Sequence, residues 1–511
     1  MENVSWLRSK SLANARVSRW RSQPVSALAV WLTGVLVVAG FPVASYLLGR
    51  PYQGDSFETL PTAWALAHGR WACAYPASMW LSPHQGISAG LAAPLFSVLM
   101  AGVFVALRAT SLHPFPAPSS MGPHCTHAIS VIETWMTRSH VMTLSLWIGL
   151  LGWLALVGAV VIFLTRRGRR MTRGDAVVFV IATCCTPVFW AYGFNFHPQD
   201  LLAIALVVLA ITFFSQQRWV GAGVLLGLGL MTQQFVALAA VPLIILAWRL
   251  GHRSFIVATV SAVATVAAPL MWLTSGAAWR SILIGSSRLA PLSTARVHSA
   301  GGTWLAGLHL NSATVFVVAR LVPLVSAIVL SYAYIRRSRG DSLVRTGPLA
   351  AMVGSCLALR LLFEQNLFPY YFAPLAVLLL LAATSMRLRT DLVVFWFLFA
   401  TIGYSPLLDS FIRSPLLVTR AEITLSTWGL IGVMIVIVIA NVVRGRLRLY
   451  QPVAVVTALL IFHAPLRGLG VQASTWEMQF LLVSLGLYIL ASALLTDAAP
   501  TEVTTPPPAT A

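Results

Sequence analysis

Residues 197–249 read HPQDLLAIALVVLAITFFSQQRWVGAGVLLGLGLMTQQFVALAAVPLIILAWR. The stretch holds three apolar runs, near 200–215, 219–232 and 234–248, and such runs are typical of helices inside a membrane. The second and third runs are short for the roughly 30 Å of hydrocarbon that a helix has to cross. They fit either a pair of half-helices that meet near the middle of the membrane or two tilted full spans.

The rest of the chain shares this composition. Of its 511 residues, 58% are hydrophobic and 9% are charged, whereas a soluble domain carries roughly a quarter charged residues. Apolar runs recur from 26–48 to 477–495 and predict an all-α polytopic membrane protein with about 12–14 transmembrane helices. The net charge of +20 does not indicate nucleic-acid binding, because the basic residues stand in short clusters between the apolar runs.

The predicted organisation has four parts. They are a cytoplasmic basic N-terminus (1–25), a transmembrane core (26–407), C-terminal transmembrane helices (408–495) and a disordered, Pro/Thr-rich tail (496–511). The first run is longer than the apolar core of a signal peptide, so we expect an uncleaved span. Every basic residue except Lys10 is Arg, which is a bias of GC-rich, bacterial genomes and predicts a bacterial plasma membrane.

Arginine clusters orient the spans. The positive-inside rule places all of them in the cytoplasm: Arg8 to Arg21, Arg166 to Arg173, Arg249 with Arg253, Arg336 to Arg339, Arg387 with Arg389, and Arg444 to Arg448. All six agree only if residues 87–107 do not cross the membrane. We therefore expect 87–107 to lie on the outer surface or to re-enter, within an external loop from 49 to 141 that carries interfacial helices. The alternative is an ordinary span that breaks the charge rule.

The external loop contains two cysteines, Cys73 and Cys125. Both are expected on the oxidising side of the membrane, where they can form a disulfide. The alternative is that they are small packing residues.

Ionisable and polar side chains gather at the external ends of the spans. Asp55 and Glu58, in GDSFETLPTAWALAHGRW, follow the first span, and the others are His197, Asp200, Arg320, Arg360 and Glu364. Charges inside a membrane are costly, and they tend to be functional. Tyr370 and Tyr371 follow Glu364 and fit either a substrate contact or an aromatic belt.

Structural alternatives exist for these residues. Asp55 and Glu58 have the D-x-x-E spacing of a capping box, but Pro61 fits better as the first residue of a helix, which would leave Asp55 with no cap to make. Pro198 fits a first helical turn, where Asp200 would favour the positive end of the helix.

Arg360 and Glu364 are four residues apart, so they can also pair on one helix face.

The layout resembles the C-type glycosyltransferases (GT-C superfamily): one span, a large external loop that opens with an acidic residue, and many further spans. GDSFETLPTAWALAHGRWACAYP (54–76) is similar to the start of actinobacterial mannosyltransferase-like members. FHPQDLLAIALVVLAI (196–211) and FEQNLFPYYFAPLAVLLLL (363–381) resemble later segments of that family. The likeness covers roughly residues 26–390.

The resemblance implies an inverting enzyme that moves a sugar, here mannose or arabinose, from a polyprenyl-phosphate carrier. The acceptor would be a glycan, glycolipid or protein of the cell envelope, at the outer face. Asp55 matches the general base. Arg360, Arg320 or His197 would stabilise the leaving phosphate. The remaining substrate-binding candidates are Glu58, Asp200, Glu364, Tyr370 and Tyr371. Some relatives hold a divalent cation such as Mg²⁺ or Mn²⁺, for which Asp55, Glu58 and Asp200 offer oxygens.

Two departures from the family pattern leave other functions open. The acids of the first loop are separated here, and Gln233 and Gln234 stand where relatives often have a basic residue. The chain could instead be a transporter or flippase of lipid-linked glycans, or a non-catalytic protein on the same fold. It has no Walker A loop, which argues against an ATP-driven transporter formed by this chain alone. A flippase would need a continuous polar path, and the polar residues stop at the outer ends.

Overall fold

The computed structural model describes residues 23–26, 28–32, 34–36, 56–74, 94–109, 139–166, 170–184, 188, 191, 196–274, 312–338, 343–361, 363 and 369–386. Apart from one isolated β-bridge, the regular structure of these residues is helical. Four of the described helices are long and apolar enough to cross a membrane. The expected all-α polytopic class is therefore confirmed. The number of transmembrane helices stays a prediction, since residues 387–511 lie outside the described part.

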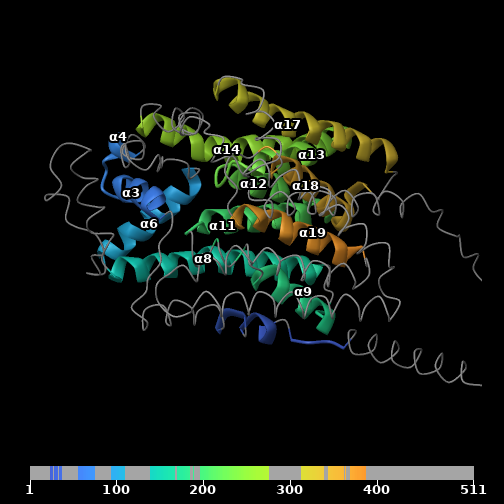
Figure 1. The fold of residues 1–511 in the computed structure, drawn as a ribbon, viewed down its shortest axis with the longest axis horizontal. Helices are drawn as coiled ribbons and strands as arrows, with labels where there is room; N and C mark the ends of the chain where they lie inside the picture. Colours follow the sequence, from blue (N-terminus) through green and yellow to red (C-terminus); the bar gives the residue numbers. More distant parts are fainter. Residues whose placement is uncertain are drawn as a thin grey trace, which may run out of the picture.

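Figure 1 shows the helices, most of which run along the long axis of the molecule. They are α3 (Ser56–Ala67), α4 (Trp71–Ala74), α6 (Pro94–Ala109), α8 (Ser139–Leu164), α9 (Arg173–Cys184), α11 (Pro198–Ser215), α12 (Trp219–Leu230), α13 (Val236–Arg249), α14 (Arg253–Leu273), α17 (Ser312–Arg337), α18 (Thr346–Leu361), the 3₁₀-helix η7 (Pro369–Phe372) and α19 (Ala373–Ser385). Between residues 139 and 386, most of the expected apolar runs become helices of nearly the expected bounds; the run 176–193 differs, since α9 ends at Cys184.

Helices α12 and α14 run parallel and in close backbone contact. Gly223 of α12 faces the carbonyl oxygen of Phe255, and Gly227, one turn later, faces that of Thr259. Both sets of residue numbers increase in the same direction. Helix α13 connects the end of α12 to the start of α14, so it runs antiparallel to both. Helices α12 and α13 therefore form a hairpin. A hairpin of two short helices fits both expected arrangements, the pair of half-helices and the two tilted spans, so the choice between them stays a prediction.

The starts of α12 and α14 lie side by side. The rings of Trp219 and His252 stack with their centroids 3.6 Å apart. The same end of the bundle holds the end of α11, because only three residues separate Ser215 from α12.

Three other helices reach this end. Thr346, at the start of α18, donates a hydrogen bond of 2.9 Å from Oγ1 to Oγ of Ser215. Arg166, just after α8, donates a hydrogen bond of 2.9 Å to Ser385, the last residue of α19. The neighbouring segment 170–173 is bridged to Pro24 through Thr172.

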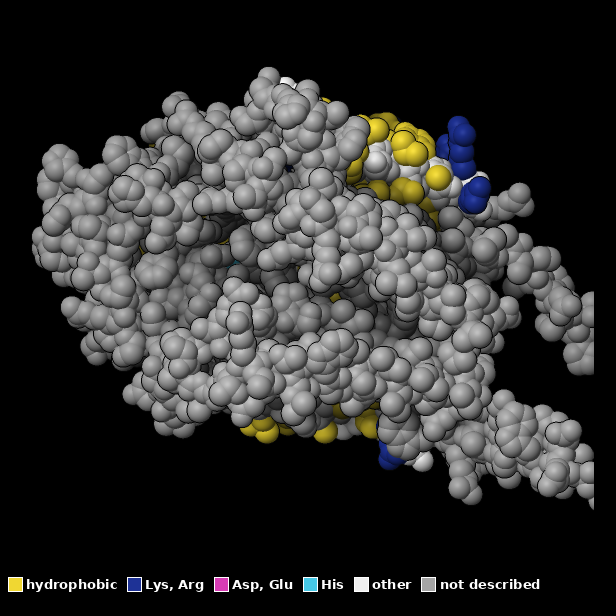
Figure 2. Space-filling model, viewed as in Figure 1, with side chains coloured by type: hydrophobic (Ala, Val, Ile, Leu, Met, Phe, Trp, Pro, Cys, Tyr) yellow, Lys and Arg dark blue, Asp and Glu magenta, His cyan; other side chains and the backbone are white. Residues whose placement is uncertain are grey.

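This end, which we name the arginine end, therefore collects the described members of the arginine clusters. They are Arg166, Arg170, Arg173, Arg249, Arg253, Arg336 and Arg337. Arg218 and Arg345 belong to none of the predicted clusters and lie at the same end. In Figure 2 dark-blue basic side chains lie toward the right of the view, beyond the yellow apolar face of the segment at the upper right. The clustering agrees with the positive-inside rule, and its assignment to the cytoplasm stays a prediction.

The opposite end of the bundle carries α3, α4 and α6. Trp64 and Leu60 of α3 are buried with Phe96 and Met100 of α6, in a small apolar cluster that also includes Phe196. In Figure 1 these helices lie at the left, and α6 crosses the bundle axis obliquely. Helix α6, which covers most of 87–107, therefore packs across the end of the bundle. The external position of loop 49–141 stays a prediction.

Candidate functional site

The start of α11 places the first site residues. Pro198 is the first residue of the helix, and Asp200 lies in the first turn, as expected. His197 is at the N-cap position, but its side chain makes no capping bond. Helix α8 comes very close here, because a Cβ on Gly152 would lie 2.6 Å from the carbonyl oxygen of Pro198. The backbone at the start of α11 is therefore packed directly against α8.

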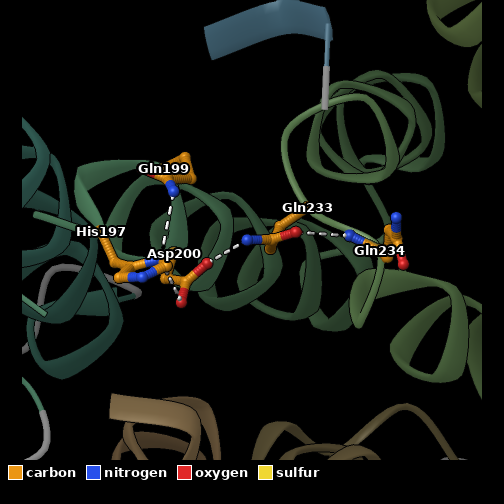
Figure 3. Close-up of polar contacts among 5 residues, drawn as sticks. All are labelled: His197, Gln199, Asp200, Gln233 and Gln234. Atoms are coloured by element: carbon orange, nitrogen blue, oxygen red, sulfur yellow. Dashed lines mark hydrogen bonds and ion pairs between the residues drawn. The ribbon is translucent and has the colours of Figure 1, made fainter. Parts of the chain in front are cut away.

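Four side chains, which we name the α11 cluster, meet at this helix start: His197, Gln199, Asp200 and Gln233 (Figure 3). Gln233 donates a short hydrogen bond from Nε2 to Oδ1 of Asp200. Nδ1 of His197 lies 3.6 Å from Oδ2 of Asp200 and 3.1 Å from Nε2 of Gln199. Nδ1 can serve only one of these two neighbours at a time, so the hydrogen bond from Gln233 is the contact that fixes the carboxylate in either tautomer of His197.

Three of the four members are buried, and Gln233 is half-buried. The exposed fractions are 7% for His197 and 3% each for Gln199 and Asp200. The helix N-terminus and the amide of Gln233 both favour a negative charge at this position.

The tip of the α12–α13 hairpin, residues 231–235, carries Gln233 into the cluster. Gln234 donates its backbone N–H to Oε1 of Gln233 at 3.0 Å, which fixes the orientation of that amide. Leu95, at the start of α6, donates its N–H to the carbonyl oxygen of Met231 at 2.8 Å. The hairpin tip therefore connects the polar cluster to α6.

Arg360 lies at the same end of the bundle. Helices α18 and α19 are antiparallel, since Gly347 faces Ser385 and Gly354 faces Leu379. The start of α18 is at the arginine end, so Arg360, in its last turn, is at the other end. Its guanidinium lies 5.6 Å from the ring centroid of Tyr371, a cation–π contact.

Arg320 is in the first third of α17 and is exposed. Because α17 ends with Arg336 and Arg337 at the arginine end, Arg320 also lies toward the opposite end.

Several predicted residues lie outside the described part. These are Asp55, Glu364 and Cys125, together with the side chains of Glu58, Cys73 and Tyr370. The acid pair, the Arg360–Glu364 pair, the disulfide and the set of cation ligands therefore stay predictions.

The expected start of the first external helix is wrong. Helix α3 begins at Ser56, five residues before Pro61. A proline in the second turn removes one hydrogen bond, but the helix continues because Leu60 and Trp64 are fully buried against α6. Asp55 directly precedes the first helical residue, so the capping-box alternative for Asp55 and Glu58 fits this helix start.

Sequence reasoning did not assign a role to Gln199 or Gln233. Gln233 was noted only as a departure from the family pattern. The available signal was the polar TQQ triplet between two short apolar runs, because amides in such a setting need buried partners.

Substituting Gln233 by methionine is expected to destabilise the protein. The change keeps the side-chain length but removes the donor to the buried Asp200 carboxylate. Loss of a hydrogen bond to a charged group costs about 1.5–3 kcal/mol. The midpoint of thermal unfolding in detergent should fall for Gln233→Met and stay near the wild-type value for Gln216→Met, at the opposite end of α11. Equal midpoints for the two variants would contradict a structural role of the Asp200–Gln233 bond.

Comparison with known proteins gives a family for the central part of the chain. Residues 123–363 match the family model of Glycosyltransferase family 87. The matched segment includes His197, Asp200, Gln233 and Arg360, whereas Asp55 precedes it. No curated protein matches the chain.

Among solved structures, the crystal structure of ArnT from Cupriavidus metallidurans bound to undecaprenyl phosphate is similar, with a TM-score of 0.41 and 13% identity. The alignment covers 90% of this chain and 77% of that chain. The matched segment is a little under half of the 511 residues, and it is this central segment that is similar to a glycosyltransferase family.

Proposed function

We propose that the protein transfers a sugar from a polyprenyl-phosphate carrier to an acceptor of the cell envelope, at the outer face of a bacterial plasma membrane. The observation that carries the proposal is the α11 cluster. It is a buried polar group at the end of the bundle away from the arginine end, inside the segment that matches a glycosyltransferase family. We take mannose or arabinose as the sugar, and a glycan, glycolipid or protein as the acceptor.

The proposed reaction is a single displacement. An acceptor hydroxyl oxygen attacks the anomeric carbon and forms the new glycosidic bond, while the bond from that carbon to the phosphate oxygen breaks. The hydroxyl proton passes to the carboxylate of Asp55, which acts as general base. The polyprenyl phosphate leaves with the bonding electron pair, and attack from the opposite face inverts the anomeric centre.

The leaving phosphate needs a fixed positive charge close to it. Arg360 fits this role, because a guanidinium can bind a phosphate with two parallel hydrogen bonds. Its contact with Tyr371 orients the side chain without neutralising its charge. Preorganised charge of this kind stabilises the transition state without reorganisation during the reaction. Arg320 is the second candidate for the same role.

A divalent cation, if held, would lie between Asp55, Glu58 and Asp200 and would supply Lewis-acid stabilisation of the phosphate. Only Asp200 has a described side chain among the three, and its carboxylate already contacts Gln233 and His197. The proposed displacement does not depend on a cation.

The test is a transfer assay with the purified full-length protein. Polyprenyl-phosphate mannose and polyprenyl-phosphate arabinose, each radiolabelled in the sugar, are incubated with envelope lipids and glycans as acceptors. We expect labelled product from at least one donor, with release of polyprenyl phosphate. Movement of the intact donor between leaflets of vesicles, with no product, would instead support the flippase.

The proposed orientation predicts a labelling pattern. In a background without the native cysteines, Trp71→Cys should react with an impermeant maleimide on intact cells. Gln217→Cys, in the exposed turn between α11 and α12, should react only after the cells are permeabilised. Both positions are exposed, so access to the reagent depends on the side of the membrane. The reverse pattern would place the α11 cluster on the cytoplasmic side.

A further inference from the structure

We infer that the α11 cluster binds the hydroxyl groups of the donor sugar, and that the phosphate of the donor lies elsewhere. The inference rests on the proposed function and names the part of the substrate that this site recognises. It follows from the hydrogen-bond donors and acceptors of the cluster and of the neighbouring helices α3 and α6.

Gln199 supplies the first observation. Its Nε2 is hydrogen-bonded to His197, but its Oε1 is buried and has no hydrogen-bond partner in the structure. A buried acceptor without a partner costs free energy and requires an explanation, such as a bound molecule. A carbonyl oxygen needs a donor. A sugar hydroxyl can donate, whereas an ionised phosphate diester can only accept.

Asp200 supplies the second observation. One of its carboxylate oxygens accepts from Gln233, and the other faces His197. A carboxylate buried in a medium of low dielectric constant would repel a phosphate placed beside it. The same carboxylate attracts hydroxyl donors, so Asp200 and Gln199 together form an acceptor pair in the first turn of α11.

Helices α3 and α6 pack together, and α6 also contacts the hairpin tip through the N–H of Leu95; both carry further buried polar atoms of a neutral kind. Thr62 Oγ1 and Trp64 Nε1 of α3 and Ser97 Oγ of α6 are buried and have no hydrogen-bond partner in the structure. Trp64 belongs to the apolar cluster that contains Phe196, the residue before His197. Two hydroxyls, an indole N–H and aromatic side chains are groups that complement a sugar ring, and none of the three polar groups carries the charge that a phosphate would require.

We then assign binding of the donor phosphate to Arg360, which is on a different helix at the same end of the bundle. The structure thus divides the donor between neutral and acidic groups on α11 and the hairpin tip, and a cation on α18. This division makes separate predictions for the two parts of the donor.

The experiment measures the binding of three lipids to the full-length protein in nanodiscs: polyprenyl-phosphate mannose, polyprenyl-phosphate arabinose and bare polyprenyl phosphate. The wild type should bind at least one sugar-bearing lipid more tightly than the bare lipid. Gln199→Met should lower that preference by about 3- to 10-fold, the effect of one neutral hydrogen bond. The affinity for the bare lipid should not change.

Gln216→Met is the matched control and should keep the wild-type preference. Arg360→Gln should weaken binding of all three lipids by similar factors. If Gln199→Met is not folded, as judged by its unfolding midpoint, Ser97→Ala serves as the second variant, because it removes only one buried hydroxyl. Its preference for the sugar-bearing lipid should also fall.

Two outcomes would overturn the inference, and they differ. If the folded Gln199 or Ser97 variant keeps the full preference, or loses affinity for bare polyprenyl phosphate as well, the assignment to sugar hydroxyls is wrong while the proposed function stands. If the wild type binds none of the three lipids, or binds the sugar-bearing lipids no more tightly than the bare one, the sugar assignment fails. A wild type that binds none of the three lipids would remove the proposed function as well.

Discussion

Substituting Asp55 by asparagine should reduce sugar transfer by about 10²- to 10⁴-fold, the usual contribution of a general base. The choice of asparagine matters, because helix α3 begins at Ser56 and Asp55 stands where an N-cap would be. Asparagine caps a helix about as well as aspartate does. Asp55→Asn therefore removes the base and keeps the cap. Initial rates of transfer, together with the thermal unfolding midpoint, measure the two roles separately.

Asp175→Asn provides the control for this experiment. Asp175 lies in the first turn of α9 at the arginine end and accepts hydrogen bonds of 2.9 Å from the backbone N–H and 2.8 Å from Oγ1 of Thr172. The same substitution there should leave transfer nearly unchanged. If Asp55→Asn keeps most of the activity, Asp55 acts as a helix cap and the general base has to be another group.

Replacing Gly223 and Gly227 by alanine should strongly destabilise the protein. A Cβ on Gly227 would lie 2.5 Å from the carbonyl oxygen of Thr259, and a Cβ on Gly223 would approach that of Phe255 even more closely. Because the obstructing atoms belong to the backbone, α12 and α14 would have to move apart. Overpacking of this kind costs about 1–3 kcal/mol for each site. The midpoint of thermal unfolding should fall for each variant and fall further for the double variant.

A matched control exists in α8. A Cβ on Gly158 would meet no other atom within 4 Å, and alanine is favoured over glycine in a helix by about 1 kcal/mol. Gly158→Ala should therefore be neutral or stabilising. The Gly223 and Gly227 variants should also lose transfer activity, since a displaced α12 carries Gln233 away from Asp200. Unfolding midpoints equal to that of Gly158→Ala would contradict the close contact of α12 and α14.

The helices were predictable where hydrophobicity alone decides them. The expected run 255–273 becomes α14 at Arg253–Leu273, and 200–215 becomes α11 at Pro198–Ser215. An apolar run flanked by basic or polar residues has few alternatives in a membrane. The packing partner of α12 was not predictable, because the sequence does not show which helix meets the glycine face of α12.

The contents of the site were less predictable than its position. The first turn of α11, with Pro198 and Asp200, follows from local rules and is confirmed. The partner of Asp200 is 33 residues away in the chain, so no local pattern identifies Gln233. The proline rule failed at Pro61, since the burial of Leu60 and Trp64 outweighs the loss of one backbone hydrogen bond.

The hairpin of α12 and α13 has a consequence for how a lipid substrate would reach the site. Helices α12 and α14 start side by side, and α12 has 12 residues against 21 for α14, so its tip stops about 13 Å short of the far end of α14. The polar cluster at the tip therefore lies part-way along α14 and not at its far end, and α6 lies against the tip through the hydrogen bond from Leu95 to Met231. Under the proposed function, a donor bound at this depth would keep its prenyl tail in the bilayer, and transfer would cost no free energy for extracting the tail.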